Sequence, residues 1–315
     1  MSAPISLAAR QSLIPLDNLL GPWLIGLLIS SVIFGITCFQ VYLYYTKFCS
    51  RDSTFLKIFV GCLLTVEILH LTLLGMSYYE ASVTNFGDYV AIFKGPWSLR
   101  AQIVVGVFLG TLVQMFYAFR IWTLAHKSPY MPLLIIICSL GALSMSIVYT
   151  IKVSITKAFD NTGDVIPFST SSLSLEVACD ALITGAMVYN LWKGHTDYHR
   201  TNRALNILIA YTINSGAITT VFAICTLVLF LTSKVTLIYS FFFFILVRLY
   251  GCSFMSILNS REYIRKQLNH EMVTIPTNTS RTVQTADHKQ TNGLDSLGTV
   301  VFARNNQQAS TLSTV

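Results

Sequence analysis

Seven long apolar runs constrain the fold of this chain more than any other feature. They lie at about 22–45, 55–79, 97–124, 131–151, 172–192, 204–232 and 235–258. A helix needs roughly 20 apolar residues to cross the hydrocarbon core of a bilayer, so each run is about long enough. None shows the period-two alternation of a membrane strand. Backbone groups in lipid must bond to one another, so the runs predict an all-α, seven-transmembrane-helix bundle.

The charge content agrees with a membrane environment. Only 11% of the residues are charged and 53% are hydrophobic, whereas soluble domains carry about 25% charged residues. A net charge of +7 can accompany nucleic-acid binding, but here Lys and Arg stand singly at the ends of apolar runs. This scatter is typical of a membrane topology signal. We therefore expect the lipid bilayer, and no nucleic acid, as a partner.

The order of the runs suggests three parts. Residues 1–21 form an N-terminal segment, 22–260 the bundle and 261–315 a polar tail. Short connections, such as 126–130, force neighbouring helices to run antiparallel. The stretch that begins at Arg261, REYIRKQLNHE, is compatible with a short surface helix. Beyond about Thr274 the tail holds too little apolar surface to fold alone, and we expect it to be mostly disordered.

Basic residues give the expected orientation. The larger set lies at the helix ends on the same side of the membrane as the C-terminal tail. It includes Lys47, Arg120, Lys193 and Arg261. The positive-inside rule places that set in the cytoplasm. The N-terminus is then outside and the C-terminus inside, and we expect the plasma membrane as the location. The outer loops are expected to be the longer ones, at 80–96 and 152–171.

Ionisable and polar residues inside the runs are the candidate functional residues. Such groups are costly at membrane depth and mark functional sites by default. The candidate intramembrane polar network contains Glu67, His70, Glu176, Asp180, Arg248 and Asn214.

Arg248 is the most informative member of this network, because an unpaired Arg in lipid costs several kcal/mol or more. Glu67 lies at a similar depth in its own run, and Asp180 lies about 7 Å nearer the outside at 1.5 Å per residue. We expect Arg248 to pair with one of these two acids inside the bundle. Such a pair either fixes helix packing only or forms part of a ligand or ion site.

The sequence shows no catalytic set. It contains no GxSxG, HExxH or phosphate-binding loop, and no CxxC pair. His70 is the one histidine inside an apolar run, whereas catalytic metal sites usually need three protein ligands. We expect no enzyme activity, no cofactor and no metal. Gly106 and Gly110, four residues apart, are simply explained by close helix packing.

Several motifs in the C-terminal half resemble those of one membrane family. Asp180-Ala181-Leu182-Ile183 is followed by WKGHTDYHRTNRALNILIAYTINSG and then by RLYGCSFMSILNSR. Together with QMFYAFRIWTL upstream, these resemble an uncharacterised fungal seven-helix family, the domain of unknown function six-five-three-four. The resemblance covers about 172–262. It implies a fungal seven-helix protein and no particular activity. Ala217-Ile218-Thr219 departs slightly from the family, which often has Leu-Thr there.

Two functions remain open from the sequence. The first is a multi-pass membrane protein, receptor-like in topology, with a small-molecule ligand and a cytoplasmic protein partner at the 193–203 loop. The alternative is a small-solute transporter or channel. A receptor predicts a ligand cleft open to the outside, and a transporter predicts a polar path that reaches both sides.

Overall fold

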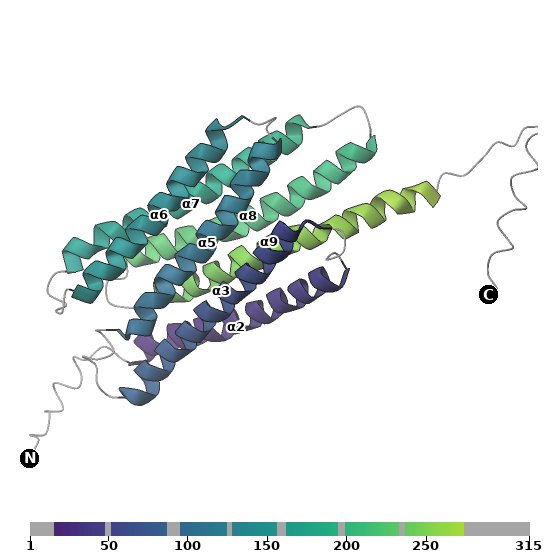
Figure 1. The fold of residues 1–315 in the computed structure, drawn as a ribbon. Helices are drawn as coiled ribbons and strands as arrows, with labels where there is room; N and C mark the ends of the chain where they lie inside the picture. The colour runs from purple at the N-terminus through teal and green to yellow at the C-terminus, as the bar shows by residue number, and fades with distance from the viewer. Residues whose placement is uncertain are drawn as a thin grey trace, which may run out of the picture. The chain divides into compact units, whose positions relative to one another are not determined.

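The computed structural model describes residues 16–47, 52–86, 95–124, 128–155, 162–194, 199–232 and 237–273. These residues are helical except for short caps and turns (Figure 1). The helices are α2 (Leu16–Lys47), α3 (Thr54–Tyr79), η1 (Glu80–Thr84), α5 (Trp97–Leu124), α6 (Tyr130–Ile155), α7 (Thr162–Lys193), α8 (His199–Thr232) and α9 (Ile238–Val273).

Seven of these helices are long and apolar enough to cross a membrane, which confirms the predicted class of integral membrane protein. η1 is a π-helical turn that continues α3. The described helices belong to one compact unit that ends at Met272. The predicted disordered tail beyond about Thr274 lies outside the described residues, as do the first fifteen residues.

Several helices extend past the apolar runs that identify them. α6 continues to Ile155 and α7 already begins at Thr162, so the prediction of a long loop at 152–171 was wrong. α9 continues without a break through Arg261 to Val273, as the sequence there allowed. Propagating an existing helix is much easier than starting one, so polar residues next to a span readily continue it.

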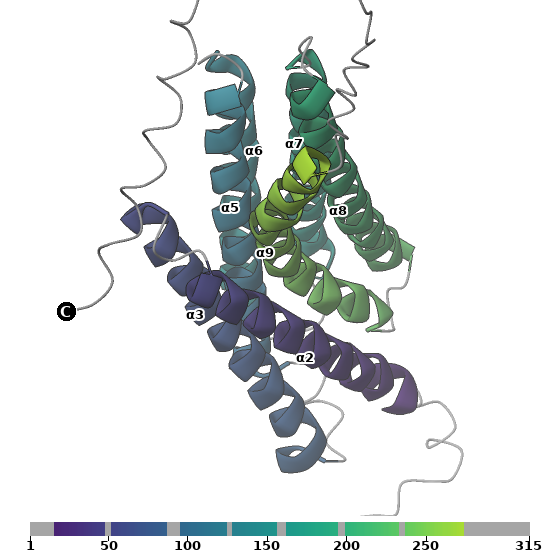
Figure 2. The same cartoon turned by 90° about the vertical axis from the view of Figure 1, so that its right-hand side faces the viewer.

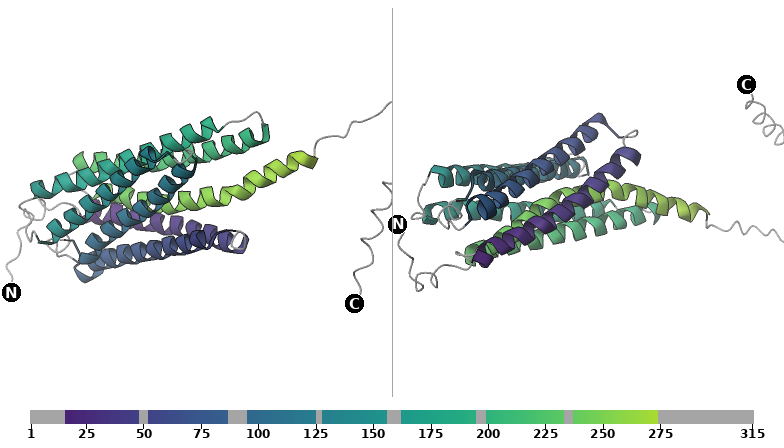
Figure 3. Two further views of the ribbon diagram at one scale, coloured as in Figure 1. Left: turned by 45° about the horizontal axis from the view of Figure 1, so that its top comes forward. Right: turned by 90° about the horizontal axis from the view of Figure 1, so that it is seen from below.

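α9 is the central helix of the bundle. In its most apolar stretch 67% of the residues are buried, against 17% in the corresponding stretch of α8. Figure 2 shows α2 and α3 on one side of α9, and α7 and α8 on the other. The last turns of α9 extend beyond the ends of its neighbours, as both views in Figure 3 show.

Small residues let α5 approach α9 closely. A Cβ on Gly106 would lie 2.9 Å from a methyl carbon of Val247, and one on Gly110 would lie 3.4 Å from the Tyr250 ring. The predicted role of both glycines in close helix packing is therefore confirmed. Because Gly106 also faces His70, this approach helps to place the first of two polar clusters.

Candidate functional site

The first polar cluster is built around Arg248 of α9, whose side chain has no exposed surface. Its Nε donates to the Ser30 hydroxyl of α2 at 3.0 Å, and its Nη1 donates to the Glu67 carbonyl oxygen of α3 at 3.1 Å. The same Nη1 lies 3.5 Å from Oε2 of the fully buried Glu67 carboxylate. The expected pairing of Arg248 inside the bundle is confirmed, and Glu67 is its partner.

His70 completes this cluster one turn after Glu67. Arg248 Nη2 lies 2.7 Å from His70 Nδ1. A guanidinium group has only donors, so Nδ1 must accept and the imidazole is neutral with its proton on Nε2. That Nε2 faces α5, where it has no hydrogen-bond partner among the described residues. Arg248 also lies over the Phe34 ring, with 5.5 Å between Cζ and the ring centre.

A glycine on α9 makes room for the Glu67 carboxyl group. Oε1 of Glu67 lies against Gly251, at a point where a Cβ atom of any larger residue would collide with it. Both carboxyl oxygens of Glu67 are buried, and neither forms a hydrogen bond to the described residues. The ion pair with Arg248 is therefore the described contact that offsets the charge of Glu67.

The second polar cluster lies on the opposite side of α9, around Asp180 of α7. Asp180 Oδ2 accepts a hydrogen bond of 2.8 Å from the Tyr250 hydroxyl of α9. Its Oδ1 accepts one of 3.3 Å from Gln114 Nε2 of α5. The described ion pairs of Arg248 and Arg261 go to Glu67 and Asp52, and neither reaches Asp180.

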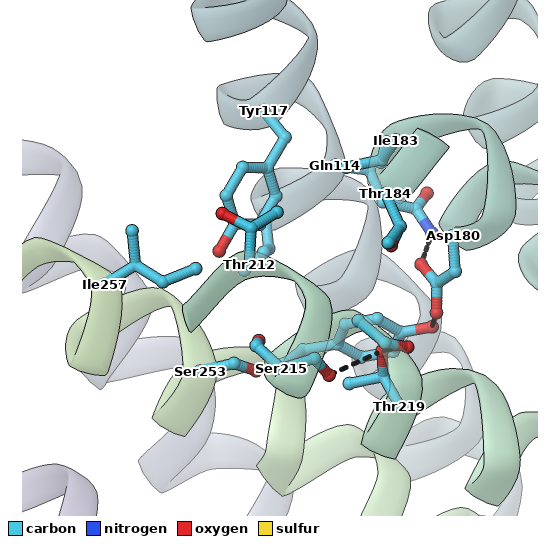
Figure 4. Close-up of a pocket in the computed structure, with 13 residues that line it drawn as sticks. Gln114, Tyr117, Asp180, Ile183, Thr184, Thr212, Ser215, Thr219, Ser253 and Ile257 are labelled. Carbon is cyan, nitrogen blue, oxygen red and sulfur yellow. Dashed lines mark hydrogen bonds between the residues drawn. The ribbon is translucent and has the colours of Figure 1, made fainter. Parts of the chain in front are cut away.

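A pocket of about 40 Å³ lies beside Asp180, between α5, α7, α8 and α9 (Figure 4). Hydroxyl groups dominate its polar lining, and they come from Tyr117, Thr184, Thr212, Ser215, Thr219, Tyr250 and Ser253. The Tyr117 oxygen is buried and has no hydrogen-bond partner among the described residues. The pocket has room for a few water-sized groups, since a cavity needs about 10–15 Å³ of such space to hold one water.

Gly216 holds the two helices of this pocket close together. A Cβ on Gly216 of α8 would collide with the Thr184 side chain of α7. Both residues line the pocket. The small volume therefore reflects a close approach of α7 to α8, the two helices joined by the 193–203 region.

In the structure, the residues of the predicted network do not form one group, and most of them lie in two separate clusters. Glu67, His70 and Arg248 meet on one side of α9, and Asp180 lies on the other. Glu176 is buried one turn before Asp180. Asn214 is exposed on α8 and belongs to neither described cluster, so its place in the network was wrong. Exposed polar and buried polar residues look alike in a single apolar run.

Buried polar groups continue from the first cluster toward the start of α5. Gln102 and Ser98 are one turn apart on α5, and both are almost fully buried. Gln102 Oε1 and Ser98 Oγ have no hydrogen-bond partner among the described residues. His70 Nε2, which faces α5, likewise has no hydrogen-bond partner among the described residues.

One ion pair lies at the ends of the spans. Arg261 of α9 binds Asp52 through two bonds, Nη2–Oδ2 at 2.7 Å and Nη1–Oδ1 at 3.2 Å. These hydrogen bonds from Arg261 lower the pKa of Asp52 from its ordinary value. Ser53, next to Asp52, accepts a weak 3.5 Å bond from the Leu56 backbone and so caps α3. The pair thus ties the start of α3 to α9.

Part of the chain that contains Asp180 and Tyr250 of the second cluster matches a known family. Residues 176–263 match the model of a Family of unknown function (DUF6534). This is the family that the sequence motifs resemble. The matched region includes Asp180, Arg248 and Tyr250, and it stops short of Glu67 and His70 on α3. No curated protein and no solved structure matches the chain.

Tyr117, Tyr250 and Gly251 are among the site residues that were not predicted. Tyr250 and Gly251 stand next to each other in the RLYGCSFMSILNSR motif, and Tyr117 stands in QMFYAFRIWTL. Tyrosine is common at membrane interfaces, where it needs no buried partner. Its position deep within a run was the available signal, because a buried tyrosine hydroxyl usually finds a hydrogen-bond partner.

Proposed function

We propose that this protein is a receptor-like, non-enzymatic seven-helix membrane protein that binds a small polar ligand in the Asp180 pocket. The observation that carries the proposal is the pocket itself, a hydroxyl-lined space beside a buried carboxylate. Organic ligands of drug size occupy roughly 300–1,000 Å³, whereas this pocket measures about 40 Å³. The ligand is accordingly very small.

A ligand in the pocket contacts the two helices whose ends the 193–203 region connects. Asp180 and Thr184 belong to α7, and Thr212 and Ser215 to α8. Thr212 lies near Ile209, where the membrane span of α8 begins. A ligand between these helices favours one spacing of their connected ends over another, because it binds the two spacings with different affinities. We propose that a cytoplasmic protein binds the 193–203 region and that its affinity depends on the distance between the connected ends of α7 and α8.

The proposal includes an orientation and a location. The N-terminus lies outside the cell, the C-terminus lies in the cytoplasm, and the membrane is the plasma membrane. The distribution of Lys and Arg supports this arrangement. The pocket is then nearer the cytoplasmic ends of α7 and α8 than their outer ends, so it is not the outward-open cleft that the sequence led us to expect of a receptor.

A ligand screen tests the proposal. The purified full-length chain is mixed with a panel of small polar solutes and ions, and its unfolding temperature is recorded. Ser215→Leu fills the pocket and should abolish the response. The neighbouring Asn214→Leu adds the same bulk on the exposed side of α8 and should retain it. A response that survives Ser215→Leu would show that the ligand binds elsewhere.

Hydrogen exchange then tests the receptor mechanism. Addition of the bound ligand should change amide exchange in the 193–203 region, because α7 and α8 both contact the pocket. The Asn214→Leu variant should show the same change and Ser215→Leu none. Binding without any change of exchange in that region would contradict signalling through it.

A small-solute transporter is the second candidate. The observation that favours it is the run of buried polar groups from Ser98 and Gln102 to His70 and Arg248, on the other side of α9. A transporter needs such groups on both sides of its binding site. Solute uptake into proteoliposomes separates the two candidates: the receptor produces none, and a transporter loses its uptake in Ser215→Leu.

A further inference from the structure

We propose that the Asp180 pocket binds a small, hard monovalent cation, for which Na⁺ is the probe. This inference rests on the proposed function, because it names the ligand class of that pocket. It follows from the charge of Asp180, from the oxygen atoms around it and from the size of the space.

The charge argument begins with the hydrogen bonds of Asp180. Both carboxyl oxygens accept, one from Tyr250 and the other from Gln114. Donors aimed at both oxygens favour the ionised carboxylate. No Lys or Arg among the described residues pairs with it. A buried, ionised carboxylate without a counter-charge is costly in a membrane, and a bound cation in the adjoining pocket compensates this cost.

Two hydroxyl groups of the pocket, those of Thr219 and Ser253, can offer oxygen lone pairs to a bound ion. Thr219 Oγ1 donates its proton to backbone carbonyl oxygens of its own helix, Ser215 at 3.3 Å and Gly216 at 3.1 Å. Ser253 likewise donates to the Leu249 carbonyl. A hydroxyl whose proton is used in this way offers only lone pairs to the pocket. Oxygen lone pairs around a carboxylate are the ligands that hard cations prefer.

Tyr117 supplies an independent observation. Its hydroxyl oxygen is buried without a hydrogen-bond partner among the described residues, and its side chain lines the same pocket (Figure 4). Buried polar side-chain atoms in proteins are nearly always bonded. A cation, or a water in its coordination shell, gives this oxygen a partner.

Size and charge define the class of cation. The pocket of about 40 Å³ accommodates a bare ion with one or two waters and excludes larger amines. Asp180 is the one carboxylate that lines it, so a single positive charge balances the site. Glu176, one turn away and also buried, adds to the negative potential.

The test uses the full-length chain in nanodiscs at constant ionic strength. Na⁺ replaces N-methylglucamine stepwise while the unfolding temperature is recorded. Ligand binding to the folded state predicts a rise that reaches about 3 °C or more at ten times the dissociation constant and then grows with the logarithm of the Na⁺ concentration. Asp180→Asn should abolish the rise. Thr219→Val should need at least about tenfold more Na⁺ for the same rise, and it serves as the second variant if Asp180→Asn does not fold.

Asp52→Asn is the matched control, because it makes the same chemical change outside the pocket and should retain the full rise. The inference is overturned if N-methylglucamine stabilises as well as Na⁺ does, or if the rise persists in both pocket variants. It is also overturned if protonation alone stabilises the protein and Na⁺ adds nothing. The two proposals fail separately. Na⁺ binding without altered amide exchange at 193–203 would contradict the receptor mechanism alone. Stabilisation by a different solute, abolished in Ser215→Leu, would contradict the cation inference alone.

Discussion

Arg248 and Tyr250 stand two positions apart on α9, yet they bind opposite sides of the bundle. Arg248 contacts Ser30 of α2 and Glu67 of α3, while Tyr250 donates to Asp180 of α7. Residues two positions apart in a helix point in directions about 200° apart around its axis. The central helix therefore links two buried acids, each through a different donor, and a movement of α9 changes both contacts together.

The ion pair of Arg248 and Glu67 can be tested with a double-mutant cycle. Arg248→Met leaves a buried carboxylate without its charge partner and should cost about 3–5 kcal/mol of stability. Adding Glu67→Gln should recover part of this loss. Adding Asp180→Asn should give a roughly additive effect, since Asp180 shares no described hydrogen-bond partner with Arg248. Unfolding of the purified variants in one detergent gives these differences, and additivity for Glu67→Gln would argue against the pair.

Gly251 should tolerate no side chain. In Gly251→Ala the new methyl group collides with the Glu67 carboxyl group, and overpacking of this kind costs about 1–3 kcal/mol. Gly185→Ala is the matched control, because nothing lies within 4 Å of the position of its Cβ. That substitution should be neutral or stabilise α7 by up to about 1 kcal/mol. Equal changes of unfolding temperature in the two variants would contradict the close approach.

Asp52 should make stability depend on pH at the acidic end. Its pKa is lowered in the folded protein, mainly by the hydrogen bonds from Arg261. Because its folded-state pKa is lowered, Asp52 contributes to stability at pH values above its unfolded-state pKa of about 3.9. This contribution is lost as the pH falls through the folded-state pKa. The pair is partly exposed, so we expect about 0.2–1 kcal/mol, reduced by salt.

The measurement compares the wild type with Asp52→Asn between neutral pH and pH 2. The wild type should be slightly more stable at neutral pH, and the difference should shrink as the pH falls below about 4 and vanish only below the folded pKa of Asp52. A difference that stays constant down to the lowest pH would show that the carboxylate charge is not its source.

The topology is tested with terminal tags. Seven spans place the two termini on opposite sides of the membrane, and the basic residues predict the C-terminus inside. A tag at residue 1 should be accessible in intact cells and a tag at residue 315 only after permeabilisation. Accessibility of both tags in intact cells would contradict the seven-span arrangement, and an accessible C-terminal tag alone would reverse the orientation.

The sequence alone determined the class of fold and the depth of its polar residues. Lipid leaves no alternative to helices for apolar runs of this length, and the positions of Arg248 and Glu67 along their runs already placed them level. The match over 176–263 covers the motifs read from the C-terminal half of the sequence, whereas QMFYAFRIWTL at 114–124 lies outside it. These conclusions need only distance along the chain, which a sequence states directly.

Only the tertiary structure decided how each helix is rotated. It selected Glu67 rather than Asp180 as the partner of Arg248, brought Tyr117 and Tyr250 to the Asp180 pocket and left Asn214 exposed. In a soluble helix the polar face reveals its rotation, but here lipid and protein interior are equally apolar. The inner and outer faces of these helices therefore look alike in the sequence, and packing alone separates them.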